Sequence, residues 1–348
     1  MDLSVMFFGA DDSDTTTDHA ARYDDILAIA RAADDLGFTA VWTPERHFQR
    51  VGQVFPNPSV LSAALAIATQ RIAIRAGSVV IPLHHPLRVV EDWAVVDNLS
   101  RGRVGISAAT GWHSADFVLA PDHYADRRER AFRDIALIRR LWAGEAVEFP
   151  DGTGQPVAVR PWPKPVSPTL PLWLTTSGNP ATWEAAGRLR TGVLGATVGQ
   201  TRDELIDKIR RYREAYGAAP DQAGAGRRGT VTLMMHAYVA ADDAEAKRKV
   251  SAPLRAYLKS YVLQTAANRA GDATAALRER EIDLMTEFAL ARYLTWGSLL
   301  GSPDTCRKTL SAMRDLDCDE IACFVDFGLE RSDVLASLRR LAELNDGA

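Results

Sequence analysis

Short runs of apolar residues alternate along the chain with longer segments whose apolar residues recur at helical spacing. Eight runs have the length and composition of buried strands, and each precedes a helical segment. These runs are residues 3–8, 40–44, 71–80, 103–109, 170–176, 192–198, 230–240 and 319–327. Repeated strand-helix units are typical of parallel α/β folds. The pattern therefore predicts a (β/α)8 TIM barrel, as a single domain over residues 1–348.

Two segments interrupt this rhythm. Residues 143–170, after the fourth helix, contain six prolines, which is too many for a core helix. We expect an insertion there, as a hairpin or an ordered loop laid over the barrel. Residues 241–300, before the eighth strand, predict two additional helices around a polar linker. This helical insertion is either a lid over the barrel mouth or a packing extension.

The composition is that of a soluble globular protein, with 47% hydrophobic and 25% charged residues. The net charge of −4 is spread along the chain, which argues against a nucleic-acid partner. No apolar run approaches the ~18–20 residues of a membrane helix, and the N-terminus lacks the features of a signal peptide. Cys306, Cys318 and Cys323 have no metal-type spacing. We expect a cytoplasmic protein without a membrane partner or a bound metal.

Charged residues follow the second strand directly. In a barrel, the loops after the strands form one face, and that face carries the chemistry. Glu45 and His47 are candidates for general acid-base catalysis, and Arg46 is a candidate for stabilising an anion. A salt-bridged loop that shapes the mouth is the alternative, and it is the preferred interpretation for Glu45 but not for His47.

Small and aromatic residues follow the third and fourth strands. Gly77 and Ser78 allow close approach of either a flat ring or another backbone segment, and the sequence leaves both interpretations open. The fourth strand leads into a run that offers close approach, a stacking surface and a proton donor: Thr110, Gly111, Trp112 and His113. An aromatic plug beneath the proline-rich segment is the alternative interpretation of this run.

Two further regions contain candidate ligands. His84 and His85 precede a helix without a supporting acidic residue or cysteine, so a capping or packing role is preferred to a metal site.

The fifth strand is followed by Ser177 and Gly178 at a predicted helix N-terminus, where backbone N–H groups can bind an anion. An ordinary helix cap is the alternative. Nearby candidates for the same anion are the hydroxyl of Tyr124 and the guanidinium of Arg128, or these two belong to a solvated helix start.

Together these motifs resemble the luciferase-like monooxygenase superfamily. The resemblance is carried by WTPERHF (42–48), by the segment from NPSVLSAALA through NLSRGR (57–103), and by GSPDTCRKTLSAMRDLDCDEI near the C-terminus. The combination of WTPERHF with ATGWHSADFVLAPDHYADRRE and SGNPATW is similar to one subgroup. Members of that subgroup occur in or beside nonribosomal-peptide and polyketide assembly lines.

The resemblance implies a two-component enzyme that uses reduced FMN supplied by a separate flavin reductase. Oxygen would add at the flavin C4a carbon, and the resulting peroxide would oxygenate a small or carrier-protein-bound biosynthetic intermediate. The resemblance also implies a homodimer. A built-in nicotinamide domain is not expected, since no G-x-G-x-x-G motif follows a strand.

Positions matched to the superfamily imply roles for individual residues. Gly77 and Ser78 would face the flavin ring through a non-proline cis peptide. Residues 110–112 would line the edge of the ring. The phosphate would be held by four residues: Arg128, Ser177, Gly178 and Thr182.

The chain departs from luciferase at one position. Arg46 stands where luciferase has the first histidine of a pair, and His47 matches the second. Arg46 would therefore hold a peroxide or an anionic substrate, and His47 or His113 would move the proton. Two other functions fit the same fold: hydride transfer with the deazaflavin F420, and a barrel that binds flavin or a partner without turnover.

Overall fold

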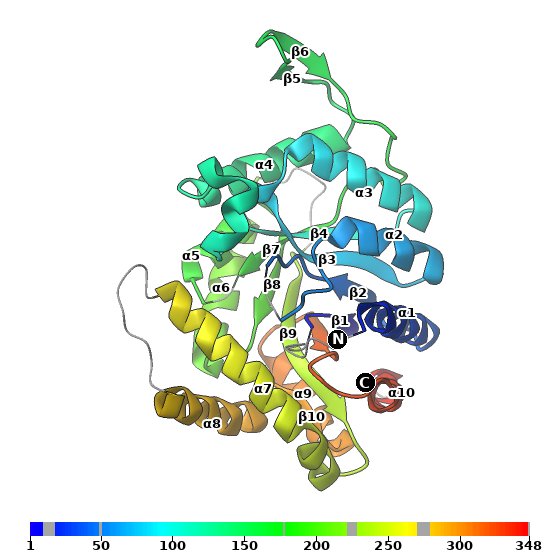
Figure 1. Cartoon of the computed structure of the whole chain (residues 1–348), viewed down its shortest axis with the longest axis vertical. Coiled ribbons are helices and arrows are strands. Elements are labelled where there is room, and N and C mark those ends of the chain that lie inside the picture. Colours follow the sequence, from blue (N-terminus) through cyan, green and yellow to red (C-terminus); the bar gives the residue numbers. More distant parts are fainter. Residues whose placement is uncertain (10–17, 49–50, 177, 221–227, 270–278, 347–348) are drawn as a thin grey trace.

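The computed structural model describes residues 1–9, 18–48, 51–176, 178–220, 228–269 and 279–346. Within these residues, parallel strands close into a barrel in the order β1-β2-β3-β4-β7-β8-β9-β11, with β11 again beside β1 (Figure 1). The strands are β1 (Asp2–Met6), β2 (Ala40–Thr43), β3 (Ala73–Val80), β4 (Val104–Ala109), β7 (Leu172–Thr176), β8 (Gly192–Ala196), β9 (Val231–Val239) and β11 (Glu320–Phe324). All eight predicted strands and the (β/α)8 barrel are confirmed.

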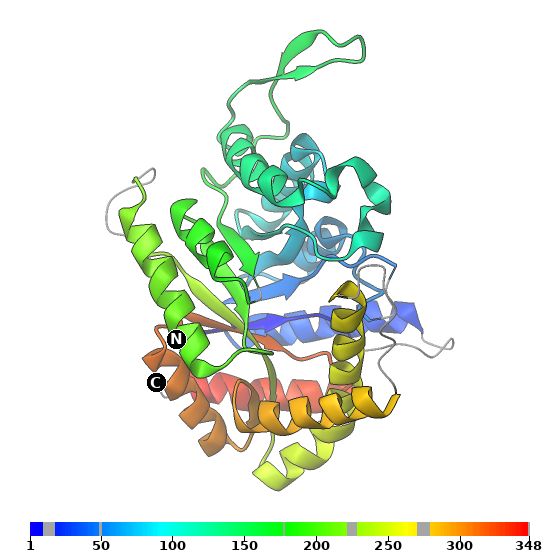
Figure 2. The same cartoon turned by 90° about the vertical axis from the view of Figure 1, so that its left-hand side faces the viewer.

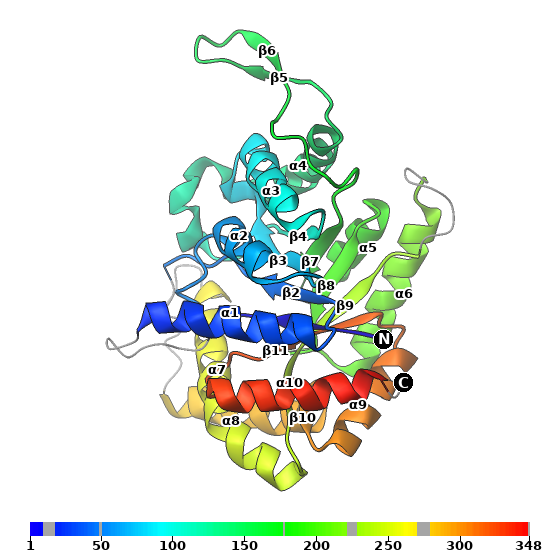
Figure 3. The ribbon, with the colours of Figure 1, turned by 90° about the vertical axis from the view of Figure 1, so that its right-hand side faces the viewer.

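Helices cover the outside of the barrel, where they bury the outward-facing side chains of the strands (Figure 3). They are α1 (His19–Asp35), α2 (Pro58–Ala68), α3 (Pro86–Ser100), α4 (Arg127–Trp142), α5 (Pro180–Arg188), α6 (Arg202–Ala218), α9 (Pro303–Asp315) and α10 (Arg331–Asp346). Several of these helices begin at a polar cap followed by proline, as at Asn57 and Pro58, where the Asn57 side chain accepts from the Val60 N–H.

A buried ion pair fills the barrel interior beneath the mouth. Arg75 Nη1 lies 2.8 Å from Glu320 Oε2, and the guanidinium is stacked against the rings of Trp42 and Trp173. Ser4 donates to Glu320 Oε1 over 2.6 Å and accepts from the Trp42 indole N–H. These contacts pair both buried charges inside the barrel.

The proline-rich insertion forms an antiparallel hairpin of β5 (Val147–Pro150) and β6 (Pro156–Val159). The expectation that it lies over the barrel is wrong, because the hairpin extends away from the rest of the chain (Figures 1 and 2). The returning segment is fixed to the outer helices. Ser167 donates its backbone N–H and its hydroxyl to Asp97 of α3, and its carbonyl accepts from Trp142 at the end of α4.

The second insertion contains two helices, as predicted: α7 (Asp243–Arg269) and α8 (Glu279–Thr295). They pack together over a hydrophobic cluster that joins Leu254, Leu258 and Leu290 to side chains of β9 and β10, and β10 (Leu299–Gly301) extends the sheet beside β9. This packing supports a packing extension, and the role as a lid stays a prediction. Among the described helices, none is both long and apolar enough to cross a membrane.

Candidate active site

Glu45 is the centre of a buried hydrogen-bond network at the end of β2. Its Oε1 lies 2.9 Å from His47 Nε2 and 2.6 Å from His84 Nε2. Its Oε2 accepts from the Val80 N–H over 2.6 Å. The Glu45 side chain is fully buried, so the two imidazoles are the groups that balance its charge.

The network alters the protonation of its members. Burial alone would raise the pKa of Glu45, but hydrogen bonds from His47, His84 and the Val80 N–H outweigh burial and lower this pKa. Burial alone would lower the pKa of His84, but the bond to Glu45 and the charge of that carboxylate outweigh it and raise this pKa. The arrangement favours an ionised Glu45 beside a protonated His84.

These shifts predict a pH-dependent effect of His84→Gln. Because the pKa of His84 is raised in the folded protein, protonated His84 stabilises the fold fully below its ordinary pKa of 6.5. This contribution is lost as the pH rises through the raised pKa. At acidic pH the contribution of Glu45 to stability is lost as well, because the carboxylate is protonated when the pH falls through its lowered pKa. We expect His84→Gln to reduce the free energy of unfolding more at about pH 6 than at about pH 9. Urea unfolding of both proteins measures this, and an equal reduction at both pH values would contradict the assigned charges.

Arg46 lies beside this network but points to another part of the mouth. Its guanidinium carbon lies 3.7 Å from the centre of the Phe8 ring, and its Cδ crosses close above Gly52. The side chain is buried, and its Nε has no hydrogen-bond partner among the described residues. A buried donor without a partner is costly, and a ligand acceptor would remove that cost.

Arg46 keeps its charge despite burial. Burial lowers the pKa of Arg46 to about 10, and the charges of Tyr257, Asp116 and Asp326 act against that shift. The guanidinium is therefore still protonated at neutral pH. It can stabilise an anion in the mouth, as the sequence predicts, but the structure adds acidic neighbours that the sequence did not indicate.

Asp116 and Asp326 are these acidic neighbours. Burial raises the pKa of Asp116, whose Oδ1 has no hydrogen-bond partner among the described residues, and the charges of His47 and Arg46 act against this rise. Burial raises the pKa of Asp326 to about 6, although its carboxylate accepts from the N–H groups of Phe8 and Gly9. Both carboxyl groups belong to the same end of the barrel as Glu45. They are further candidates for moving a proton near neutral pH.

The third and fourth strands contribute a wall of small and hydroxyl side chains. The peptide bond between Gly77 and Ser78 is cis, which agrees with the resemblance. A Cβ on Gly77 would lie 2.9 Å from Met6 Cε, so packing inside the barrel also requires glycine here. The hydroxyl of Ser78 is hydrogen-bonded to Thr175 Oγ1, which lies 2.6 Å from Ser107 Oγ.

The run after β4 is arranged by Gly111. Its φ of +77° is unfavourable for other residues, and a Cβ would lie 2.7 Å from the Phe117 ring. The partly buried Thr110 precedes it, and the half-exposed ring of Trp112 lies 3.7 Å from that of the buried His113. Trp112 is thus a surface at the rim and not a plug beneath the hairpin, because the hairpin lies elsewhere.

The candidate phosphate site lies at the N-terminus of α5. Arg128 Nη2 lies 3.3 Å from Thr182 Oγ1, so two of the predicted phosphate ligands meet. Apart from its chain neighbours, no described residue lies within 4 Å of the position of a Cβ on Gly178. Asn179 caps the helix by accepting from the Ala181 N–H, so the capping interpretation holds as well. Ser177 lies outside the described residues.

Tyr124 makes its ring contacts elsewhere than with Arg128 and Thr182. Its ring packs on Phe117, and the guanidinium of Arg127 lies 4.3 Å from the ring centre.

The two histidines before α3 have different roles. His85 caps the helix by accepting from the Leu87 N–H, as predicted, whereas the capping or packing role expected for His84 is wrong because its side chain binds Glu45.

The site residues that the sequence analysis missed are Thr175, Asp116 and Asp326, and it gave His84 another role. Thr175 and Asp326 lie in the runs 170–176 and 319–327, which were predicted as strands. Both lie near the carboxyl ends of the observed strands, β7 and β11. The rule that selected Glu45 would have selected them. Asp116 lies in a 3-10 segment, η2 (Ser114–Leu119), and had no comparable signal.

Comparison with known proteins agrees with this architecture. The family model described as luciferase-like monooxygenase matches residues 1–320. The oxygenase component of flavin-dependent trigonelline monooxygenase from Acinetobacter baylyi is 26% identical over 330 residues, covering 92% of this chain and 88% of that protein. Limonene 1,2-monooxygenase from Rhodococcus erythropolis is 35% identical over 121 residues, covering 35% of this chain and 31% of that protein.

Solved structures show the same fold. Monooxygenase RslO1 from Streptomyces bottropensis superposes with a TM-score of 0.77 at 25% identity, and the match covers 100% of both chains. The oxygenating constituent of 3,6-diketocamphane monooxygenase from Pseudomonas putida, solved with FMN, has a TM-score of 0.76 at 18% identity, covering 99% of this chain and 97% of that one. The family model spans nearly the whole barrel, including the ends of the strands that carry Glu45, Arg46 and Thr175. The chain therefore belongs to the luciferase-like monooxygenase family.

Proposed function

We propose that the enzyme is the oxygenase component of a two-component system that uses reduced FMN and oxygen. A separate flavin reductase would supply the FMN. The substrate would be a small or carrier-protein-bound biosynthetic intermediate, in keeping with the resemblance to the assembly-line subgroup. Support comes from the Acinetobacter baylyi relative, which is described as a flavin-dependent oxygenase component, and from the diketocamphane monooxygenase solved with FMN.

The observation that carries this proposal is the contact between Arg128 and Thr182 at the start of α5. A guanidinium, a hydroxyl and the N–H groups of a helix N-terminus are a suitable donor set for a phosphate. Gly178 leaves space beside them. Gly77 and Ser78, near the end of β3, would face the flavin ring, as the resemblance implies.

Bound reduced FMN would supply the activation of oxygen. The chain's own residues would then control charge and protons around it. Arg46 would stabilise an anion, because it is buried and protonated at neutral pH and its Nε–H has no partner among the residues that the structure describes. His47 would move a proton, since Glu45 orients its Nε2, and His113 is a second candidate. The packed side chains beneath the mouth, Arg75 with Trp42 and Trp173, would keep water away from one side of the site.

Rapid mixing tests this proposal. The protein is saturated with reduced FMN without oxygen and then mixed with oxygenated buffer. We expect the absorbance of oxidised flavin to return much more slowly than for free reduced FMN, because the enclosed site would protect the reactive flavin from water and protons. Return at the rate of free flavin would contradict the proposal, and so would a complex that does not react with oxygen at all.

Removing the Arg128 charge should weaken cofactor binding. Arg128→Gln is expected to raise the dissociation constant of reduced FMN about 10- to 100-fold, the usual cost of losing one charge-assisted hydrogen bond to a phosphate. Anaerobic fluorescence titration measures the constant. Arg140→Gln is the control, since Arg140 is on the same helix but pairs with Glu145 in solvent. An unchanged constant in Arg128→Gln would place the phosphate elsewhere.

We further propose a cytoplasmic homodimer. α2 and α3 pack side by side and leave large apolar side chains in solvent: Val60, Ile67, Val95 and Leu99. Such a surface is typical of a protein interface. A monomer in sedimentation-velocity experiments at micromolar concentration would contradict this assignment.

A further inference from the structure

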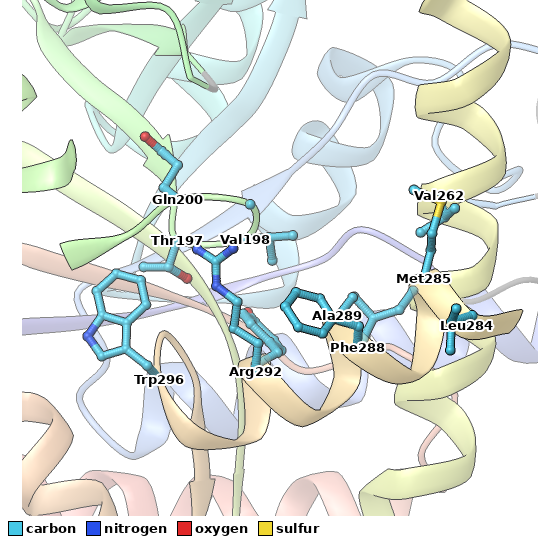
Figure 4. A pocket seen from close by; sticks show the side chains of 13 residues that line it. Thr197, Val198, Gln200, Val262, Leu284, Met285, Phe288, Ala289, Arg292 and Trp296 are labelled. Carbon is cyan, nitrogen blue, oxygen red and sulfur yellow. The ribbon is translucent and has the colours of Figure 1, made fainter. Parts of the chain in front are cut away.

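A large apolar groove lies at the barrel mouth between the end of β8, α7 and α8. Its volume is about 560 Å³, which is in the range of small-molecule sites. Its walls are mainly hydrophobic side chains: Leu258, Val262, Leu284, Met285, Phe288 and Trp296. Figure 4 shows Met285 on α8 reaching toward Val262 of α7, with the Phe288 ring between Met285 and Arg292.

Side chains of this groove are unusually exposed for their type. Leu284 and Phe288 are each 72% exposed, and Met285 is 47% exposed. Residues 284, 285 and 288 share one side of α8, because positions three and four apart on a helix are neighbours. An exposed apolar surface of this kind marks a binding site more often than a free surface, since leaving it in water is unfavourable.

The groove contains one charged residue among those that line it, Arg292. Figure 4 shows its side chain extending from α8 toward Thr197 and Val198, beside Trp296. Among the described residues Arg292 forms no ion pair, although its charge contributes to lowering the pKa of Glu204 in α6. The Glu204 carboxylate already accepts from the Thr201 N–H in the capping box of α6. The guanidinium is therefore available to an anionic group of a ligand.

Packed aromatic side chains connect the wall of the groove to Arg46. Tyr293 forms part of its wall, and the Tyr293 hydroxyl lies 3.0 Å from both the backbone nitrogen and Nδ1 of His236 in β9. The His236 ring packs on Phe324, and Phe324 packs on Phe8, whose ring also contacts the guanidinium of Arg46. A chain of aromatic side chains thus runs from the wall of the groove to Arg46.

We propose that this groove binds the apolar, non-reacting part of the substrate, an aromatic or alkyl group that carries an anionic substituent paired with Arg292. The flavin candidates lie at the ends of β3, β4 and β7 and at α5, so the groove at β8, α7 and α8 occupies another part of the mouth. Identifying the occupant as the substrate rests on the proposed function; the binding itself does not.

Two fluorescent probes test the inference. Anilinonaphthalene sulfonate carries an aromatic system and one anionic group, and N-phenylnaphthylamine has the same rings without the charge. We expect wild-type protein to bind both, and Phe288→Asp to weaken both by about tenfold or more, because a carboxylate in the groove must be desolvated. Arg292→Gln should weaken the sulfonate probe about tenfold and the neutral probe less than about twofold.

Val157→Asp is the control variant, since Val157 is an exposed apolar residue of the distant hairpin. It should change neither probe, and thermal melting should show that all three variants are folded. Failure of wild-type protein to bind either probe would overturn the inference, as would unchanged binding by Phe288→Asp. Equal effects of Arg292→Gln on both probes would overturn the claim that the ligand carries an anionic substituent paired with Arg292. Reduced-FMN affinity, measured in parallel, separates these outcomes from failure of the proposed function.

Discussion

Glu45→Ala is expected to destabilise the protein by about 3 kcal/mol, because it removes the acceptor of the buried Val80 N–H together with the partner of two imidazoles. It should also abolish the fixed orientation of His47. Glu45→Gln keeps an acceptor but no charge, so we expect a smaller destabilisation and a fall in the pKa of His84. Urea unfolding and NMR titration of the imidazoles measure these effects.

Glu91→Ala provides the comparison for this result. Glu91 also pairs with a cation, Arg88, but both side chains are well exposed to solvent. Its replacement should change the free energy of unfolding by less than about 0.5 kcal/mol. If Glu45→Ala were as mild as Glu91→Ala, the buried network would not hold the mouth together, and the orientation assigned to His47 would lose its basis.

Arg46→Ala is expected to impair turnover on the order of 100-fold while leaving the affinity for reduced FMN largely intact, because one buried donor aimed at developing charge contributes that much in other enzymes. A measurement that needs no substrate is the delay before oxidised-flavin absorbance returns after mixing with oxygen. This delay should shorten strongly in Arg46→Ala, since an anion in the mouth would lose its cation.

Two further substitutions separate charge from packing. Arg46→Met fills most of the volume beside Phe8 and Gly52 without the charge, and it should behave like Arg46→Ala. Arg46→Lys keeps the charge and should recover part of the delay. Loss of FMN affinity with an unchanged delay would show that Arg46 binds the cofactor and takes no part in the chemistry.

The barrel was predictable because its strands are buried on both faces and therefore appear as continuous apolar runs, such as residues 230–240. The direction of the hairpin was not. Prolines exclude a helix in residues 143–170, but the anchoring of Ser167 to Asp97 decides where the segment lies, and these residues are 70 positions apart.

Individual site contacts show the same limit. The rule that chemistry follows the strands predicted that Glu45 and His47 lie at the mouth, but it does not specify which side chains touch. His84 was assigned to the cap of α3 because it precedes a proline-initiated helix, and only the fold brings it within 2.6 Å of Glu45, 39 residues away. The groove was also not predicted, since the spacing in α8 indicated a helix and not which side would stay uncovered.

Anaerobic titration of the wild-type protein with reduced FMN and, separately, with reduced F420 tests the central claim most directly. The contact of Arg128 with Thr182 offers a compact site for one phosphate at the start of α5. The account predicts saturable binding of reduced FMN that is clearly tighter than binding of F420. Tighter binding of F420 would contradict it and indicate a hydride-transfer enzyme, and binding of neither would indicate a barrel without flavin chemistry.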